Sequence, residues 1–304
     1  LVLNAPNGGE LKYLYYGSKL SETDLQHINE ASNCNHTAYP VYGMNCPGEA
    51  ALSVKHADGN MSTQLLVEEY GITAVDEQAP NGKPRKGSLL TIKMKDPLYP
   101  TYVNLYYFAY SDVDMIECWT DITNGEKKTV APTQFYSSCM PIRRGNVWIN
   151  HFHGSWAAEA QMVEEELNNG LLRIKNKDGL RNATTDRQEV MFSLDGKPAE
   201  NHGRTIGAAL CYTGNYRLQV ETYNTDYHYL LAGIDEECSA YHLARGERFV
   251  TPVLALTYSN EGKGGVSRTF HRWGREYKLC HGNQVRDILL NSWEGVYMNV
   301  EEKK

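Results

Sequence analysis

The sequence lacks the short motifs by which several large enzyme classes are recognised. Its 304 residues contain no Gly-x-Ser-x-Gly, no Gly-x-Gly-x-x-Gly before a helical pattern and no Gly-x-x-x-x-Gly-Lys-Ser/Thr. A hydrolase nucleophile elbow, a dinucleotide site and a P-loop therefore have no basis in the sequence, and we expect no cofactor.

Long runs of basic residues and long runs of apolar residues are also missing. The 30 basic residues are outnumbered by 37 acidic ones, which gives a net charge of −7, and no basic block is longer than a pair. This pattern offers no complement to a polyphosphate backbone, so nucleic acid is not an expected partner. No apolar run approaches the ~20 residues that cross a bilayer, so no membrane partner is expected either.

Cysteine and histidine give little indication of a metal site. The seven cysteines are scattered and include no Cys-x-x-Cys pair, which argues against a disulfide framework and a zinc cage. On a strand, His151 and His153 would share one face, as two metal ligands can, and Glu159 or His56 could supply a third. Structural histidines without a metal are the preferred interpretation.

What the sequence does contain is many short segments typical of β-strands. In residues 88–95 apolar and polar side chains alternate, and Asn124-Gly125 is a strong hairpin signal. Such segments, divided by turn residues, predict an all-β fold of two packed antiparallel sheets. Residues 157–167 (AAEAQMVEEEL) are the exception, because good helix formers fill them and propensity predicts a helix.

After residue 258 the pattern changes. Residues 259–265 are rich in glycine and predict a flexible break, and we interpret the Gly-Lys-Gly-Gly within them as a hinge rather than a phosphate loop. Ser267 can then cap a helix, and residues 288–293 (ILLNSW) resemble a single strand. A lone strand cannot bury its own faces, so it must pack on the sandwich or belong to a domain that is cut off.

No pair of carboxylates identifies itself as a general acid and a nucleophile. A retaining glycosidase needs two carboxyl groups about 5–5.5 Å apart, usually on different strands, and sequence spacing cannot locate them. Asp58, Asp114, Asp121 and Glu294 remain equal candidates, with turn formation or solvation as the simpler role of each. Residues 39–49 form a loop rich in Pro, Gly and aromatics that suits either a binding site or an ordered turn.

Several segments stand out for their length and their order along the chain. The longest is residues 258–272 (YSNEGKGGVSRTFHR), which is far more specific than a three-residue motif. The others are residues 39–43 (YPVYG), 51–59 (ALSVKHADG), 153–156 (HGSW), 206–216 (IGAALCYTGNY), 231–234 (LAGI), 246–252 (GERFVTP) and 288–297 (ILLNSWEGVY). Together they resemble the amino-terminal part of glycoside hydrolase family 36, the α-galactosidases and their raffinose-handling relatives.

This resemblance implies a domain organisation. A large amino-terminal β-supersandwich would span residues 1–258, a linker helix would lie within residues 259–282, and residues 283–304 would begin a truncated (β/α)8 barrel. Residues 289–293 would be the first barrel strand. The resemblance also implies that residues 157–162 are extended, against their helix propensity.

The resemblance further implies what the chain does and what it lacks. Family members are retaining glycosidases whose two catalytic aspartates lie on later barrel strands, so none is expected before Lys304 and this chain alone should be inactive. Trp293 matches an aromatic residue at the sugar-binding end of the first barrel strand, where a ring can cover the C–H face of galactose. The loop after Tyr42 and Gly43 reaches a neighbouring subunit's active site in oligomeric relatives.

Two short segments depart from the family pattern. Asn45 and Cys46 stand in the loop where the family has an acidic residue and an arginine, and both become candidate substrate-binding residues. The loss of a charged acceptor removes a strong hydrogen bond to sugar hydroxyls, which leaves the substrate preference open. Met298 and Asn299 replace a Phe-Asp pair that relatives often have.

The leading hypothesis is a parent enzyme that hydrolyses terminal α-galactosides, with an oligosaccharide as its partner. In it this domain would support a homo-oligomer through the β-sandwich and form the active-site rim. The alternatives are the same fold acting on α-N-acetylgalactosaminides, and a non-catalytic carbohydrate-binding or structural β-sandwich. Unpaired cysteines suit the cytoplasm, but secreted bacterial relatives favour a periplasmic or secreted form.

Overall fold

The computed structural model describes residues 1–30, 36–44, 48–79, 81–181, 186–223, 226–238 and 240–302. Strands predominate in these residues, and each strand pair is antiparallel, in the larger sheet as in the smaller one. This confirms the predicted all-β fold of packed antiparallel sheets.

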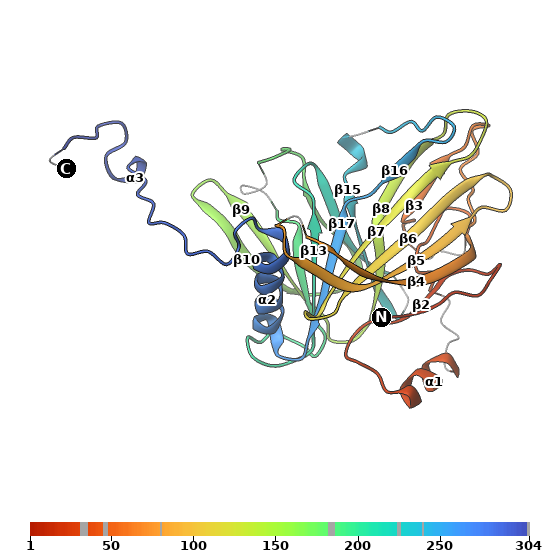
Figure 1. Ribbon diagram of the computed structural model, residues 1–304, viewed down its shortest axis with the longest axis horizontal. Helices are drawn as coiled ribbons and strands as arrows, with labels where there is room; N and C mark the ends of the chain where they lie inside the picture. Colours follow the sequence, from red (N-terminus) through yellow and green to blue (C-terminus); the bar gives the residue numbers. More distant parts are fainter. Residues whose placement is uncertain are drawn as a thin grey trace.

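The larger sheet contains ten of the described strands. They are β4 (Leu66–Gln78), β5 (Pro84–Lys95), β6 (Thr101–Tyr110), β7 (Met115–Asn124), β9 (Trp148–Ser155), β10 (Ala158–Glu166), β12 (Glu189–Ser193), β13 (Thr205–Cys211), β16 (Arg248–Val250) and β17 (Val253–Ser259). Their order is β10-β9-β12-β13-β17-β7-β6-β5-β4, and β16 pairs with β7. Figure 1 shows β9 and β10 at one side of the molecule and β4 to β6 at the other.

The smaller sheet contains five described strands in the order β11-β14-β15-β8-β3. Their bounds are β3 (Leu52–Lys55), β8 (Ala131–Arg143), β11 (Gly170–Asn176), β14 (Tyr216–Thr222) and β15 (Tyr227–Ile234). The remaining elements are β1 (Val2–Asn4), β2 (Lys12–Tyr15), α1 (Glu22–Glu30), η2 (Glu236–Cys238), α2 (Gly262–Trp273), the π-helical turn η3 (Gly274–Lys278) and α3 (Trp293–Val296). No helix in the described part of the chain is long and apolar enough to cross a membrane.

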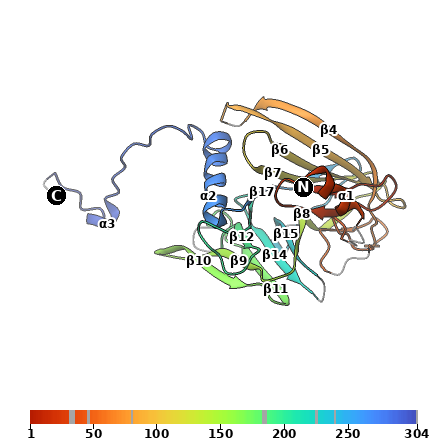
Figure 2. The same ribbon diagram turned by 90° about the horizontal axis from the view of Figure 1, so that it is seen from below.

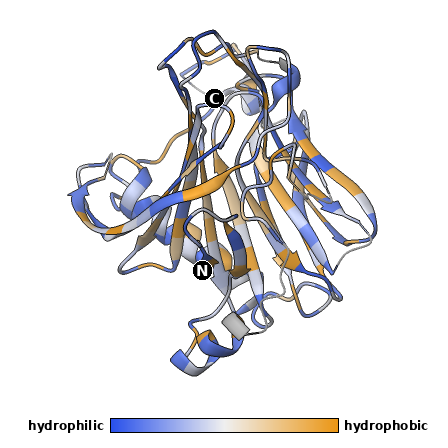
Figure 3. Cartoon of the chain, turned by 90° about the vertical axis from the view of Figure 1, so that its right-hand side faces the viewer, coloured by the Kyte–Doolittle hydropathy of each residue, from blue (hydrophilic) through white to orange (hydrophobic). Residues whose placement is uncertain are grey.

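The two large sheets share one hydrophobic core. Ile92 and Val103 of the larger sheet and Leu218 and Val220 of the smaller one are at most 2% exposed and belong to the same buried cluster. Apolar and polar residues alternate along many of the strands in Figure 3, as strands packed on one face require. Burial of each such side chain stabilises the fold by roughly 1.5–3 kcal/mol.

Strands β4 and β10 form the two edges of the larger sheet. Much of each is exposed on both faces, and each carries four acidic residues, Glu68, Glu69, Asp76 and Glu77 on β4 and Glu159, Glu164, Glu165 and Glu166 on β10. The prediction of a helix over residues 157–167 from propensity is wrong, because most of these residues form strand β10, which pairs with β9. The extended backbone implied by the resemblance is found over residues 158–162, whereas Ala157 lies in the turn between β9 and β10.

The glycine-rich segment after β17 is not the flexible break that its composition predicts. Helix α2 begins at Gly262, five residues before Ser267, and the backbone N–H groups of Gly262, Lys263 and Gly264 donate to the carbonyls of residues 203, 199 and 200 at 2.9, 3.1 and 2.9 Å. A Cβ on Gly262 would lie 2.4 Å from the Ala199 carbonyl oxygen. The start of α2 is therefore fixed against the sandwich, at the end of the molecule from which the C-terminal segment extends (Figure 2).

The strand predicted over residues 289–293 is not formed. Residues 285–292 have no regular structure, Trp293 begins the short helix α3, and Ile288, Leu289 and Leu290 are almost fully exposed. A strand needs neighbouring strands to satisfy its backbone groups, and no described strand lies beside this segment. The segment extends away from the sandwich in Figure 1.

The contact at Gly262 gives a test of the rigid junction. Gly262 has φ +68° and no room for a Cβ, whereas Gly8 has φ +71° with nothing within 4 Å of an added Cβ. We expect Gly262→Ala to lower the free energy of unfolding by about 2–4 kcal/mol and Gly8→Ala by only about 1 kcal/mol. Denaturant unfolding followed by fluorescence measures both, and equal losses would contradict the assignment.

Candidate functional site

The predicted binding loop begins at a buried residue that is fixed by a hydrogen bond. Tyr39 is 1% exposed, and its hydroxyl donates to the Tyr136 carbonyl oxygen at 2.7 Å. Gly43 has φ +119°, and a Cβ there would lie 2.6 Å from Ser62 Oγ, so the turn into the loop requires glycine. Asn45 and Cys46 lie outside the described residues.

The other end of the loop is fixed on the smaller sheet. The backbone N–H of Glu49 donates to Glu221 Oε2 at 2.8 Å. The amides of Gln134 and Gln219 donate to Glu49 Oε2 at 2.9 and 2.6 Å. Because Gln219 and Glu221 are at most 1% exposed, this end of the loop is held by buried side chains of β14.

Arg217 balances the negative charge of this cluster. Its guanidinium forms an ion pair with Glu236, lies 3.7 Å from Glu49 Oε2 and donates to the Tyr136 hydroxyl at 2.7 Å. Burial raises the pKa of Glu221, and the charge of Glu49 adds to the rise although the Glu49 N–H opposes it. Such a network suits the positioning of a loop, and sequence reasoning missed it.

The four carboxylates proposed as acid or nucleophile each have separate surroundings. Asp58 accepts from the Tyr99 hydroxyl at 2.9 Å, and Asp121 accepts from Tyr106 at 2.6 Å and pairs with Arg248 at 2.7 Å. Asp114 lines a cleft beside α2, and Glu294 lies in α3. These contacts give Asp58 and Asp121 structural roles.

The two histidines of β9 have different partners. His151 Nε2 lies 3.1 Å from Glu165, and His153 Nδ1 lies 2.8 Å from Asp186. His56, one of the suggested third ligands, instead contacts Glu126 and Thr63 at 2.7 and 2.9 Å. In the part of the chain that the structure describes, no group of three His, Cys, Asp or Glu side chains could hold a metal ion.

The end of the linker helix is joined to the larger sheet by a buried carboxylate. Glu117 on β7 is 2% exposed, pairs with Arg85 at 2.6 Å and with Lys278 at 2.7 Å, and accepts from the Tyr110 hydroxyl at 2.7 Å. Tyr277 donates to Asp112 at 2.6 Å. Lys278 and Tyr277 belong to η3, and a π-helical turn changes the direction of side chains relative to an uninterrupted α-helix.

Trp293 is not brought to any of these groups. Its residue is 53% exposed, and the ring contact given for it is with Tyr297 of the same segment, at 5.4 Å between centroids. The candidate site residues therefore do not converge in the described residues. The loop ends and the linker junction are assembled, while the sugar-facing position of Trp293 remains a prediction.

Comparison with known proteins assigns the family. A model of the glycosyl hydrolase family 36 N-terminal domain matches residues 9–244, and a melibiase model matches residues 248–304. The chain belongs to glycoside hydrolase family 36. It carries the N-terminal domain of that family, which confirms the resemblance.

Curated relatives of this family 36 chain extend well beyond the part that it covers. The bifunctional alpha-galactosidase/sucrose kinase AgaSK of Mediterraneibacter gnavus is 26% identical, over 96% of this chain and 34% of the relative. The alpha-galactosidase AgaA of Geobacillus stearothermophilus is 28% identical, over 88% of this chain and 37% of the relative. The chain spans about a third of the length of these relatives.

Solved structures show the same fold. The alpha-galactosidase from Lactobacillus brevis has a TM-score of 0.86 and 19% identity over 99% of this chain and 44% of that chain. Alpha-galactosidase AgaA from Geobacillus stearothermophilus in complex with raffinose has a TM-score of 0.87 and 20% identity over 99% of this chain and 45% of that one.

The ion pair between Glu117 and Lys278 should stabilise the end of the linker helix against the larger sheet. Replacing Lys278 by Met removes one of two cations from a buried carboxylate, and we expect a loss of about 1–2 kcal/mol in the free energy of unfolding. Amides of residues 274–279 should exchange faster with deuterium. Lys127→Met, on an exposed residue, is the control; equal protection in the two variants would show that the ion pair does not hold the linker.

Proposed function

We propose that this chain is the amino-terminal portion of a retaining glycosidase that hydrolyses terminal α-galactosidic bonds. The observation that supports this proposal is the succession of two family matches, the N-terminal domain over residues 9–244 and melibiase over residues 248–304. In this proposal residues 1–258 form the sandwich, 259–282 the linker, and 283–304 begin the barrel that carries both catalytic aspartates after Lys304.

The substrate class is supported by the names of the relatives. Those of Mediterraneibacter gnavus and Geobacillus stearothermophilus are alpha-galactosidases, and variants of AgaA have been solved in complex with raffinose and with stachyose. A terminal α-galactoside is accordingly the substrate that we propose for the whole enzyme.

The sandwich would contribute an anchored loop to the active-site rim. Tyr39 and Glu49 hold the two ends of the loop on buried groups, so Asn45 and Cys46 would be presented to substrate from a rigid support. Amide and thiol side chains lack the negative charge that gives strong hydrogen bonds to hydroxyls. The preference between galactoside and N-acetylgalactosaminide would follow from this exchange.

Activity assays test the function. The full-length parent should release nitrophenol from nitrophenyl α-galactoside with retention of configuration, and residues 1–304 alone should release none. In the parent, Trp293→Ala should lower kcat/KM roughly tenfold or more, since a stacked aromatic contributes ~1–3 kcal/mol.

Trp156→Ala is the matched control for Trp293→Ala, because Trp156 is 87% exposed in the β9–β10 hairpin. Unchanged kinetics in the Trp293 variant would contradict the assignment of Trp293 as a substrate-binding residue. If the parent hydrolyses nitrophenyl α-N-acetylgalactosaminide but not the galactoside, the proposed substrate would change to α-N-acetylgalactosaminides. If it hydrolyses neither compound, the proposal that it is a glycosidase would be wrong.

The rim role also predicts the oligomeric state. If the loop completes a neighbouring subunit's active site, the parent enzyme must be a homo-oligomer that associates through the sandwich. Multi-angle light scattering should give a mass of at least two protomers at assay concentration. A strictly monomeric enzyme with full activity would contradict the shared loop.

A further inference from the structure

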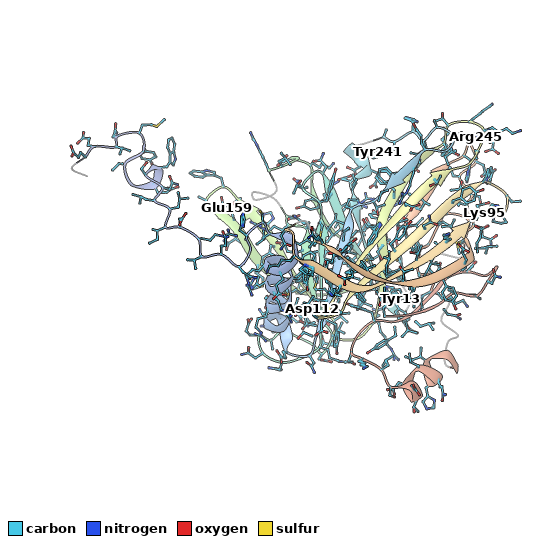
Figure 4. The ribbon with its side chains drawn as sticks, in the orientation of Figure 1. Tyr13, Lys95, Asp112, Glu159, Tyr241 and Arg245 are labelled. Atoms are coloured by element: carbon cyan, nitrogen blue, oxygen red, sulfur yellow. The ribbon has the colours of Figure 1, made fainter. Side chains whose placement is uncertain are left out.

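A cleft lies at the junction of the linker helix with the sandwich. Its volume is about 620 Å³, within the range of small-molecule sites. One wall is α2, another is formed by the end of β6 and the turn into β7, and residues 1, 16–19 and 258–261 complete the lining. Figure 4 shows Asp112, which lines it, beside α2. None of the loop and barrel residues discussed above for substrate binding contributes to this junction cleft.

Two tyrosines give the junction cleft aromatic surface. Tyr16 and Tyr258 line it, and both are partly exposed. Burial raises the pKa of Tyr16, and the nearby Cys118 and Asp114 add to the rise. A tyrosine combines an apolar ring with a polar end, which suits the C–H faces and hydroxyls of a sugar.

The charges around the junction cleft cancel. The lining contains three acidic and three basic side chains, Asp112, Asp114, Glu261, Lys19, Arg268 and Arg272. Arg268 pairs with Glu261 at 2.8 Å and Arg272 lies 3.5 Å from Asp112. The equal numbers of acidic and basic side chains leave no excess of positive side-chain charge, which disfavours phosphate and other anions as ligands.

Asp114 is an exposed carboxylate that is left available in the junction cleft. Among the described residues no hydrogen bond or ion pair is made by its carboxylate, and its backbone carbonyl alone accepts, from Thr257. A carboxylate can accept from two adjacent hydroxyl groups, and such charge-assisted hydrogen bonds are stronger than neutral ones.

We propose that the junction cleft is a second carbohydrate site that binds a neutral oligosaccharide through Tyr16, Tyr258 and Asp114. Aromatic surface, an available carboxylate and balanced side-chain charges together select a ligand that is uncharged and rich in hydroxyl groups. The choice of an α-galactoside as this ligand rests on the proposed function, whereas the chemical class follows from the cleft itself.

Titration of the 304-residue chain with raffinose, followed by isothermal calorimetry and by NMR, tests the site. We expect saturable binding that weakens about tenfold in Asp114→Asn and in Tyr258→Ala, and that persists in Tyr258→Phe, which keeps the ring. Tyr70→Ala and Asp76→Asn, on exposed residues of edge strand β4, are matched controls that should bind as the unaltered chain does. Circular dichroism checks that each variant is folded.

The outcomes separate the cleft from the proposed function. No saturable binding of raffinose or of maltotriose, or binding that folded Asp114→Asn and Tyr258→Ala retain in full, would overturn the site. If the chain binds maltotriose but not raffinose, and Asp114→Asn and Tyr258→Ala lose that binding, the cleft would be supported as a carbohydrate site but not as a site for galactosides. If the chain binds raffinose but its parent hydrolyses no α-galactoside, the carbohydrate site would be supported and the proposed enzymatic function would be contradicted.

Discussion

The arrangement of the molecule depends on a contact that only glycine allows. At the start of α2 three backbone N–H groups meet carbonyls of residues 199–203, and Gly262 has no Cβ to hold the two segments apart. Because a helix is stiff, fixing its first turn fixes the direction of the rest. Lys278 then reaches Glu117, and the junction cleft forms between the helix and the strands.

The period of side chains predicted most of the sandwich. Residues 88–95 alternate between apolar and polar side chains, and they lie within β5, which begins at Pro84 and ends at Lys95 as the alternation does. Local composition failed where tertiary contacts decide the structure. Residues 157–167 contain helix formers but pair with β9, and the glycines of residues 262–265 signal flexibility but serve close packing.

The candidate site was predicted less completely, for a physical reason. The loop anchor combines Glu49 with Gln219 and Glu221, which lie about 170 positions away, and no local pattern announces such a contact. The one sequence signal is the polar series at alternate positions of β14, in a strand that is otherwise apolar. Trp293 was identified by resemblance alone, and among the described residues its ring contact is with Tyr297 of the same exposed segment.

The acidic edges of the larger sheet limit how copies of this chain can meet. An unpaired edge strand invites another strand to extend the sheet, and charged residues are a known means of preventing it. Here β4 and β10 each carry four carboxylates, and those of β4 pair with basic side chains of β5, so another strand added at this edge would press against charged side chains. Growth into an open β-ribbon through either edge is therefore disfavoured.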